Sequence, residues 1–111
     1  MARYKMLVLS RPTEGCEDEY NDWYQNTHLA QIISLPGFIA AERYELAVNM
    51  LGEGAYPYIA IYEIETDDVQ SAFAALQDAA GDGSIVMSPA FDTASVYASI
   101  YAPLGERISR S

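Results

Sequence analysis

The sequence predicts an α+β fold in which strands and helices follow the order β-α-β-β-α-β. Two segments, 17–34 and 66–80, contain no glycine or proline and are long enough for several helical turns. Four other segments are rich in aliphatic and aromatic residues, which are common in strands. Glycine and proline separate these six segments, so the chain divides cleanly into alternating elements.

The first half of the chain predicts a strand, a helix and a second strand. Residues 3–10 are mostly aliphatic and form the first strand, and a loop with Pro12 and Gly15 follows. The first helix is expected over 17–34, with acidic residues in its first turn and Pro36-Gly37 at its end. The second strand is expected over 38–48, and its alternation fits only with a bulge or an early end. One face of it would carry Phe38, Ala40, Glu42, Tyr44 and Leu46.

The second half predicts a hairpin loop, a strand, a helix and a last strand. Residues 49–56 contain two glycines and suit the hairpin loop, and the third strand runs from 58 to 64 after Pro57. Asp67 and Gln70 have the spacing of a capping box, so the second helix starts there, and Gly81 closes it. The last strand is expected from about 92 to 102, and the tail to Ser111 is expected to be loose.

This order is the ferredoxin-like topology, a four-stranded antiparallel sheet with both helices on one face. A sheet covered on one side usually has a polar open side. Here the expected strands are apolar or aromatic on both faces. The second face therefore predicts a homodimer, formed by packing the open sheet against a second copy.

Composition restricts the kind of protein further. The chain has 111 residues and a net charge of −10, which suits one domain over residues 1–111 and disfavours nucleic acid or an anionic membrane as partner. No segment is long and apolar enough for a signal peptide or a membrane span. Cys16 is the single cysteine, which excludes an intramolecular disulfide and is compatible with the cytoplasm.

His28 is the only histidine and the first candidate for acid or base catalysis. On a regular helix, Tyr20 and Tyr24 share a stripe with Thr27 and Gln31, and Trp23 and His28 flank this stripe on opposite edges. The alternative is a histidine at the helix edge that is hydrogen-bonded or solvated.

Nine tyrosines are many for this length. Tyr58 and Tyr62 share one face of the third strand, and Tyr97 and Tyr101 share one face of the fourth. Several tyrosines on one side would line a pocket that suits a phenolic or polyketide-like ligand. The alternative is that they fill the core or the dimer interface.

Arg43 and Cys16 have competing interpretations. Arg43 could hold a carboxylate or an enolate, or form a salt bridge with Glu42 or Glu45. Cys16 is expected to be an incidental loop residue, because the acidic residues after it disfavour a thiolate. The sequence has no clustered cysteine or histidine ligands and no glycine-rich phosphate loop, so no metal site and no cofactor are predicted.

The first half of the chain also resembles a known family. Trp23-Tyr24 is followed by His28-Leu29, then by Leu35-Pro36-Gly37-Phe38 and by Arg43-Tyr44. This pattern, over residues 4–46, resembles the EthD-type branch of the dimeric α+β barrel superfamily. The resemblance implies a two-fold dimer, helices on the outside, and a ligand cavity between sheet and helices in each protomer.

The same resemblance implies cofactor-free chemistry on hydrophobic, oxygenated small molecules such as aromatic or polyketide-like compounds. The reaction would be a proton transfer of a lyase, isomerase or cyclase, with His28 as acid or base and Tyr24 as its catalytic support. The residues expected to bind the substrate are Trp23, Phe38, Arg43, Tyr58, Tyr62 and Tyr97. Some relatives use two histidines, whereas this chain has one, so a second group would be a tyrosine or a carboxylate.

Two other functions stay open at this stage. The chain could be a non-catalytic module that binds a small molecule for an oxygenase or a catabolic pathway. It could also be a haem-dependent relative with His28 as axial ligand. Its six basic residues are few for holding haem propionates.

Overall fold

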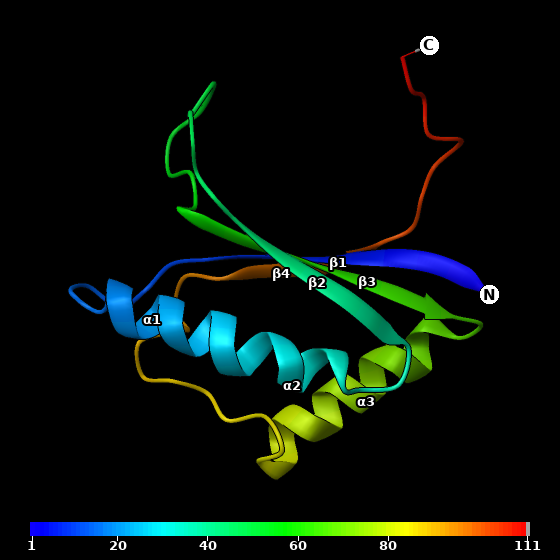
Figure 1. Cartoon of the computed structure of the whole chain (residues 1–111), viewed down its shortest axis with the longest axis horizontal. Helices are drawn as coiled ribbons and strands as arrows, with labels where there is room; N and C mark the ends of the chain where they lie inside the picture. Colours follow the sequence, from blue (N-terminus) through cyan, green and yellow to red (C-terminus); the bar gives the residue numbers. More distant parts are fainter. Residues whose placement is uncertain (111) are drawn as a thin grey trace.

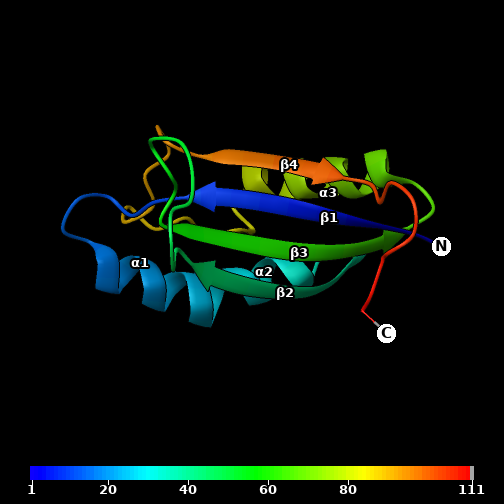
Figure 2. The ribbon, with the colours of Figure 1, turned by 90° about the horizontal axis from the view of Figure 1, so that it is seen from above.

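The structure, a computed structural model, describes residues 1–110 and confirms the ferredoxin-like order (Figure 1). Its strands are β1 (Ala2–Ser10), β2 (Phe38–Glu45), β3 (Tyr58–Thr66) and β4 (Tyr97–Tyr101). Its helices are α1 (Glu17–Trp23), the π-helical turn η1 (Tyr24–His28), α2 (Leu29–Ile33) and α3 (Val69–Asp82). The strands form one antiparallel sheet in the order β2-β3-β1-β4. All helices lie on the same face of this sheet (Figures 1 and 2).

The strand register gives the sheet two different faces. Met6 pairs with Tyr62 and Ser10 pairs with Tyr58, and these residues point toward the helices with the other even-numbered positions of β1 and β3. Half of these ten positions are fully buried in the core, and all but one of the others are partly buried. The odd-numbered positions, such as Leu7, point to the other side, where no element of residues 1–110 covers the sheet.

A β-bulge changes the expected faces of β2. Phe38 pairs with Ile64, but Ala40 pairs with the preceding residue of β3, Glu63. The extra residue reverses the alternation, so Phe38 is buried on the helical side together with Ala41. The prediction that Phe38 shares a face with Ala40 was wrong. Of the two expected alternatives, a bulge or an early end, the early end is confirmed, since β2 stops at Glu45, whereas the bulge at the start of the strand was not predicted.

The first helical segment is not the regular helix that the sequence predicts. It covers residues 17–33, but its middle turn, η1, has the wider i→i+5 hydrogen bonding of a π-helix. A wider turn brings residues five apart closer together around the helix axis. Trp23 and His28 therefore stack on one another instead of standing on opposite edges, as a regular wheel predicts.

The boundaries of the last two elements also differ from expectation. Asp68, not Asp67, caps α3, and its carboxylate accepts hydrogen bonds from the backbone N–H of Gln70 and Ser71. Gly83, not Gly81, ends the helix, because Gly83 adopts the left-handed conformation that closes it. β4 has only five residues, since most of the expected first half of this strand forms a loop.

Two segments extend from the open side of the sheet. One is the loop 46–57 between β2 and β3, and the other is the tail 102–110 (Figure 1). They rise from opposite ends of the sheet on the side that the helices leave free (Figure 1). Within residues 1–110, none of the helices has the length and apolarity needed to cross a bilayer.

Candidate functional site

An aromatic cluster fills the space between η1, its flanking helix α1 and the sheet. Tyr20 anchors it, because the Tyr20 and Ser10 hydroxyls lie 2.5 Å apart and hydrogen-bond in the buried core. The rings pack mainly edge-to-face or tilted, as aromatic rings prefer, at centroid distances of 4.4 to 6.3 Å. The members of the aromatic cluster are Tyr20, Trp23, Tyr24, His28, Tyr58 and Phe91.

His28 is held in this cluster by ring contacts alone. Its imidazole stacks on Trp23 at 4.4 Å and meets the Tyr24 ring edge-on at 5.0 Å. The side chain is 8% exposed, and its buried Nδ1 has no hydrogen-bond partner in residues 1–110. Burial without a counter-ion lowers the pKa of His28 to about 4. The ring is therefore neutral at pH 7 and can accept a proton.

Two tyrosine hydroxyls are, like His28 Nδ1, buried and orphaned, which means that they have no hydrogen-bond partner. The hydroxyl oxygens of Tyr24 and Tyr62 are buried and have no hydrogen-bond partner among the described residues. Burial raises the pKa of Tyr24 to about 12, and it also raises the pKa of Tyr62, to which the nearby Tyr24 contributes. Both hydroxyls therefore stay protonated and can donate a hydrogen bond. An unpartnered buried hydroxyl costs free energy, so its presence needs an explanation.

Arg43 borders the aromatic cluster and makes no salt bridge with Glu42 or Glu45. Its guanidinium lies 4.6 Å from the Tyr24 ring centroid and donates a 2.7 Å hydrogen bond to Asn21 Oδ1. Asn21 in turn donates to the Tyr58 hydroxyl at 3.1 Å. Glu42 lies on the other face of the sheet, where it accepts a hydrogen bond from Tyr44. A positive charge therefore stands beside the tyrosines.

The loop 83–96 covers the cluster from the side away from Arg43. Trp23 Nε1–H donates to the Val86 carbonyl at 2.9 Å, and Gln31 Oε1 accepts from the Val86 N–H at 3.3 Å. Phe91 packs against Tyr20, Trp23 and Tyr24. Sequence reasoning missed these partners, because the loop meets the helix more than 50 positions away and carries no motif.

The structure brings most of the predicted site residues together. Trp23, Tyr24, His28 and Tyr58 belong to the cluster, and Arg43 contacts it. Tyr62 lies on the same face of the sheet. Phe38 is buried further along that face beside Ile64. Tyr97 is not brought to the cluster, because it pairs with Leu9 and points to the open side of the sheet. Sequence reasoning missed Ser10, Asn21 and Phe91.

Four hollows of about 250 to 650 Å³ lie beside the cluster, on the open face of the sheet and between α3 and the sheet. Neither His28 nor Tyr24 lines any of these four. The smallest, about 250 Å³, opens beside Arg43 and Tyr58. The family resemblance implies a cavity between sheet and helices, and a hollow of about 500 Å³ lies there, between α3 and the strands β1 and β4. Around His28 the same layer is filled by rings, so a ligand at His28 requires rings or the loop 83–96 to move. No group of three or more potential metal ligands occurs within residues 1–110.

Comparison with solved structures identifies the fold. An EthD-like protein from Ralstonia eutropha superposes with a TM-score of 0.65 over 99% of each chain, at 14% sequence identity. This chain shares the ferredoxin-like fold of that protein. A dimeric ferredoxin-like protein of Thermobifida fusca matches with a TM-score of 0.59 at 16% identity over 92% of each chain. The heme-degrader MhuD from Mycobacterium tuberculosis matches with a TM-score of 0.62 at 13% identity, over 94% of this chain and 98% of that one.

The three structures are 13 to 16% identical to this chain in sequence, so the likeness concerns the fold alone. No protein-family model and no curated protein matches the chain. The function must therefore be argued from the residues of the site.

Proposed function

We propose that this chain binds a small, mainly apolar, oxygenated molecule at the aromatic cluster and moves a proton of that molecule with His28. The observation that carries the proposal is the set of three orphaned polar atoms, His28 Nδ1 and the hydroxyls of Tyr24 and Tyr62. Native proteins rarely leave buried polar groups without a partner, and exceptions concentrate at functional sites. A bound ligand with a carbonyl and an acidic C–H would supply the missing partners.

The roles follow from the protonation states. Neutral His28 accepts the proton from the carbon next to a carbonyl. The electron pair of that C–H bond forms a C=C bond, and the π pair of the C=O bond moves to the oxygen. The protonated hydroxyls of Tyr24 and Tyr62 donate hydrogen bonds to the resulting oxyanion. Arg43, 4.6 Å from the Tyr24 ring, adds a positive field to the same region. The proton then returns to another carbon or to a leaving oxygen, which gives isomerisation or elimination.

Access to this site depends on the loop 83–96. Phe91 and Trp23 occupy the space beside Tyr24, and a single side-chain hydrogen bond from Trp23 ties the indole to this loop. The backbone on both sides of Phe91 is also held, because the Thr13 N–H donates to the Ala90 carbonyl at 2.6 Å and the Asp92 N–H donates to the Arg11 carbonyl at 3.2 Å. Exposure of His28 therefore requires the Phe91 ring to rotate or these bonds to open, in addition to release of the bond from Trp23. Trp23 and Phe91 then form the apolar wall of the opened site.

Proton exchange tests the proposal without a known substrate. A panel of aromatic and polyketide-like ketones and lactones is incubated with the protein in D₂O, and deuterium at the carbon next to the carbonyl is followed by NMR. For any compound whose exchange the wild-type protein accelerates, His28→Gln should lower the exchange rate by roughly 10²- to 10⁴-fold, because a positioned acid or base contributes that much to a rate. Gln25→Ala, an exposed change on the same turn, should leave the rate unchanged. Exchange by His28→Gln within a few-fold of wild type would contradict the mechanism.

The competing function is binding without chemistry. The same orphaned atoms would hold a ligand, and an associated oxygenase or pathway enzyme would transform it. This alternative predicts a compound that binds with the same dependence on Tyr24 and Tyr62 and returns from the protein unchanged. It also predicts that no member of the panel exchanges faster than in buffer.

The residues around His28 do not fit haem. A haem site needs space at the imidazole and cationic groups for the propionates, and the imidazole here is stacked on Trp23 and closed off by the edge contact with Tyr24. Arg43 is the one cationic side chain that contacts the described cluster, and it is engaged with Asn21. Haem chemistry therefore has no place in the proposal.

The proposal also includes a two-fold homodimer through the open face of the sheet. Leu7 and Leu9 on β1 and Ile59 and Ile61 on β3 form an apolar stripe there, half-buried by their neighbours. Such a stripe is typical of an interface rather than of a free surface. The dimeric ferredoxin-like protein of the same fold supports this assembly.

A further inference from the structure

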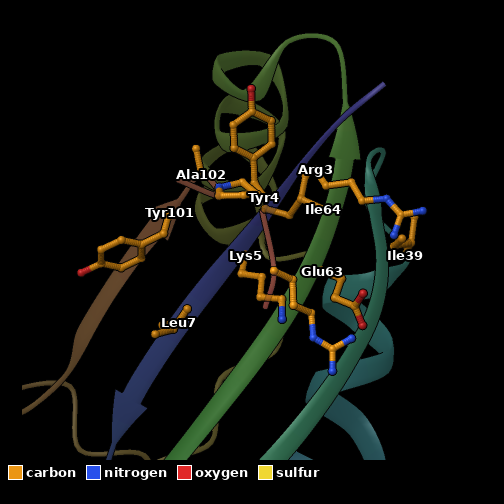
Figure 3. A pocket seen from close by; sticks show the side chains of 11 residues that line it. Arg3, Tyr4, Lys5, Leu7, Ile39, Glu63, Ile64, Tyr101 and Ala102 are labelled. Atoms are coloured by element: carbon orange, nitrogen blue, oxygen red, sulfur yellow. The ribbon is translucent and has the colours of Figure 1, made fainter. Parts of the chain in front are cut away.

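Three of the six basic residues of the chain line a single hollow on the open side of the sheet. This hollow has a volume of about 580 Å³, which is within the range of about 300 to 1,000 Å³ of small-molecule sites. Figure 3 shows Lys5 and Leu7 of β1 at its centre, between Tyr101 of β4 on one side and Glu63 and Ile39 on the other. The start of the C-terminal tail also lines it. The hollow is therefore large enough for a small ligand.

The lining of this hollow is mainly apolar. Leu7 is partly buried, and Ile39 and Tyr101 beside it are 51% and 48% exposed. The Tyr101 hydroxyl is hydrogen-bonded to the hydroxyl of Tyr97, which holds the Tyr101 ring along the hollow. Apolar and aromatic walls around a concave surface are typical of sites for apolar molecules. The body of a ligand here would therefore be apolar.

Positive charge exceeds negative charge among the lining residues. The cations are Arg3, Lys5 and Arg107, and the one carboxylate is that of Glu63. Arg3 is partly neutralised, because its Nε lies 3.6 Å from Glu65 Oε2. Lys5 and Arg107 form no ion pair within residues 1–110, although Glu63 lies directly opposite Lys5 on β3. Further acidic residues at this end of the sheet do not line the hollow; they are Asp67, Asp68 and Glu106.

The tail brings one of these cations to the sheet. Gly105 has a positive φ of 79° and turns the tail between Pro103 and Arg107, and both of these residues line the hollow. Arg110 follows three residues later and does not line it. The tail therefore carries two exposed arginines of equal charge, of which only Arg107 belongs to the hollow.

We infer that this hollow binds an apolar molecule with one carboxylate, such as a bicyclic aromatic acid. The ammonium of Lys5 and the guanidinium of Arg107 attract the carboxylate, and the apolar body lies against Leu7, Ile39 and Tyr101. A protein with a net charge of −10 repels anions in general, so affinity for a carboxylate at this place must come from the local cations. The site lies on the opposite side of the sheet from His28 and goes beyond the proton transfer proposed above.

Titration with 2-naphthoate, followed by ¹H–¹⁵N NMR, tests this site. The neutral 2-naphthamide has the same rings without the charge and is the matched probe. The amide signals of Lys5, Leu7 and Tyr101 should shift, and naphthoate should bind about ten-fold more tightly than naphthamide, as two exposed ion pairs provide. Arg107→Gln should weaken naphthoate binding by about three- to five-fold, the effect of one exposed ion pair. Arg110→Gln changes the net charge equally and should leave the affinity unchanged.

Three results of this titration would overturn the site. Equal affinities for naphthoate and naphthamide would show that the cations do not recognise the carboxylate. Equal losses in Arg107→Gln and Arg110→Gln would show general attraction to the tail in place of a site. Shifts confined to the aromatic cluster, such as those of Tyr24 and His28, would place the ligand on the other side of the sheet.

Two further measurements separate this site from the proposals above. The proposed dimer uses the same side of the sheet, so the titration is repeated over a series of protein concentrations. A constant affinity supports a site that stays open, and an affinity that falls as the protein dimerises would overturn it by placing the hollow inside the interface. His28→Gln should bind naphthoate as wild type does, so the outcome of the proton-exchange experiment does not affect this result.

Discussion

At the scale of single residues, the charge state of His28 links function to stability. The folded protein holds this imidazole neutral by burial, whereas the unfolded chain gives it its ordinary pKa of 6.5. The unfolded state therefore binds more protons between pH 6.5 and about 4, and stability must fall as the pH decreases through this window. Because the pKa is lowered from 6.5 to about 4, the free energy of unfolding should fall by about 3 kcal/mol as the pH decreases through this window.

We expect His28→Gln to remove this component of the acid sensitivity. The free energy of unfolding, measured by urea titration at pH 7 and at pH 4, should fall less in the variant than in wild type, by about 3 kcal/mol. Carboxylates that titrate at low pH are present in both proteins, so the difference isolates the imidazole. An identical pH dependence in both proteins would show that His28 is not buried neutral.

The orphaned hydroxyls predict that a substitution can lower the activity without lowering the stability. Tyr62→Phe removes a buried hydroxyl that has no partner, so the free energy of unfolding should stay constant or rise by up to about 1 kcal/mol. Proton exchange should nevertheless fall, by roughly 10²-fold, because an oxyanion donor is lost. An unchanged exchange rate in Tyr62→Phe would show that the Tyr62 hydroxyl does not act on the substrate.

Tyr20→Phe is the matched comparison for that prediction. It removes the partner of the buried Ser10 hydroxyl, so it should lower the free energy of unfolding by about 1 to 3 kcal/mol. Equal stabilities of Tyr20→Phe and Tyr62→Phe would contradict the assignment of one hydroxyl as paired and the other as orphaned.

At the scale of elements, the start of α3 gives a clean contrast between adjacent residues. Asp68→Ala should cost about 1 kcal/mol of unfolding free energy, because the carboxylate of Asp68 satisfies two backbone N–H groups. Asp67→Ala should have little effect, since Asp67 is exposed and is not the cap. Thermal unfolding of the two variants measures the difference directly, and equal losses would contradict the observed cap.

The same element shows how far the sequence predicts the fold. Glycine and proline punctuation predicted all four strands and both helical segments, because these residues act through local backbone geometry. The choice between Asp67 and Asp68, or between Gly81 and Gly83, depends on where the helix meets the sheet, which a local pattern does not contain. The π-helical turn and the bulge before Ala40 escaped prediction for the same reason.

The candidate site was predictable only in part. The helical spacing placed Tyr20 and Tyr24 on one stripe of a helix with His28 at its edge, and the structure buries all three. Ser10 and Phe91 are brought to them by strand register and by a loop, and neither has a signal of its own in the sequence. Tyr97 and Tyr101 are four residues apart, as Tyr58 and Tyr62 are, yet Tyr97 faces the other side of the sheet. The sequence could not separate the two pairs, because alternation alone does not say which face is covered.

At the scale of the whole molecule, the open face of the sheet determines the assembly. Ile61→Lys at its centre should raise the dimer dissociation constant by about 100-fold or more, because the ammonium would be desolvated at the interface. The added positive charge also makes an acidic protein less negative, so stronger general repulsion between the copies cannot explain a loss of dimer. Sedimentation velocity over a concentration series measures it, with Ile33→Lys on the helical side as control. A dimer that survives Ile61→Lys would place the interface elsewhere.

The stack of Trp23 on His28 makes the protein its own optical probe. Trp23 is the only tryptophan in the chain, so its fluorescence reports on one location. An imidazolium quenches a stacked indole more strongly than a neutral imidazole does, so emission should drop as the pH approaches 4. A ligand that displaces Phe91 or breaks the bond from Trp23 to Val86 should shift the same emission. Compound libraries can therefore be screened on the unlabelled protein, with no assumption about the reaction it performs.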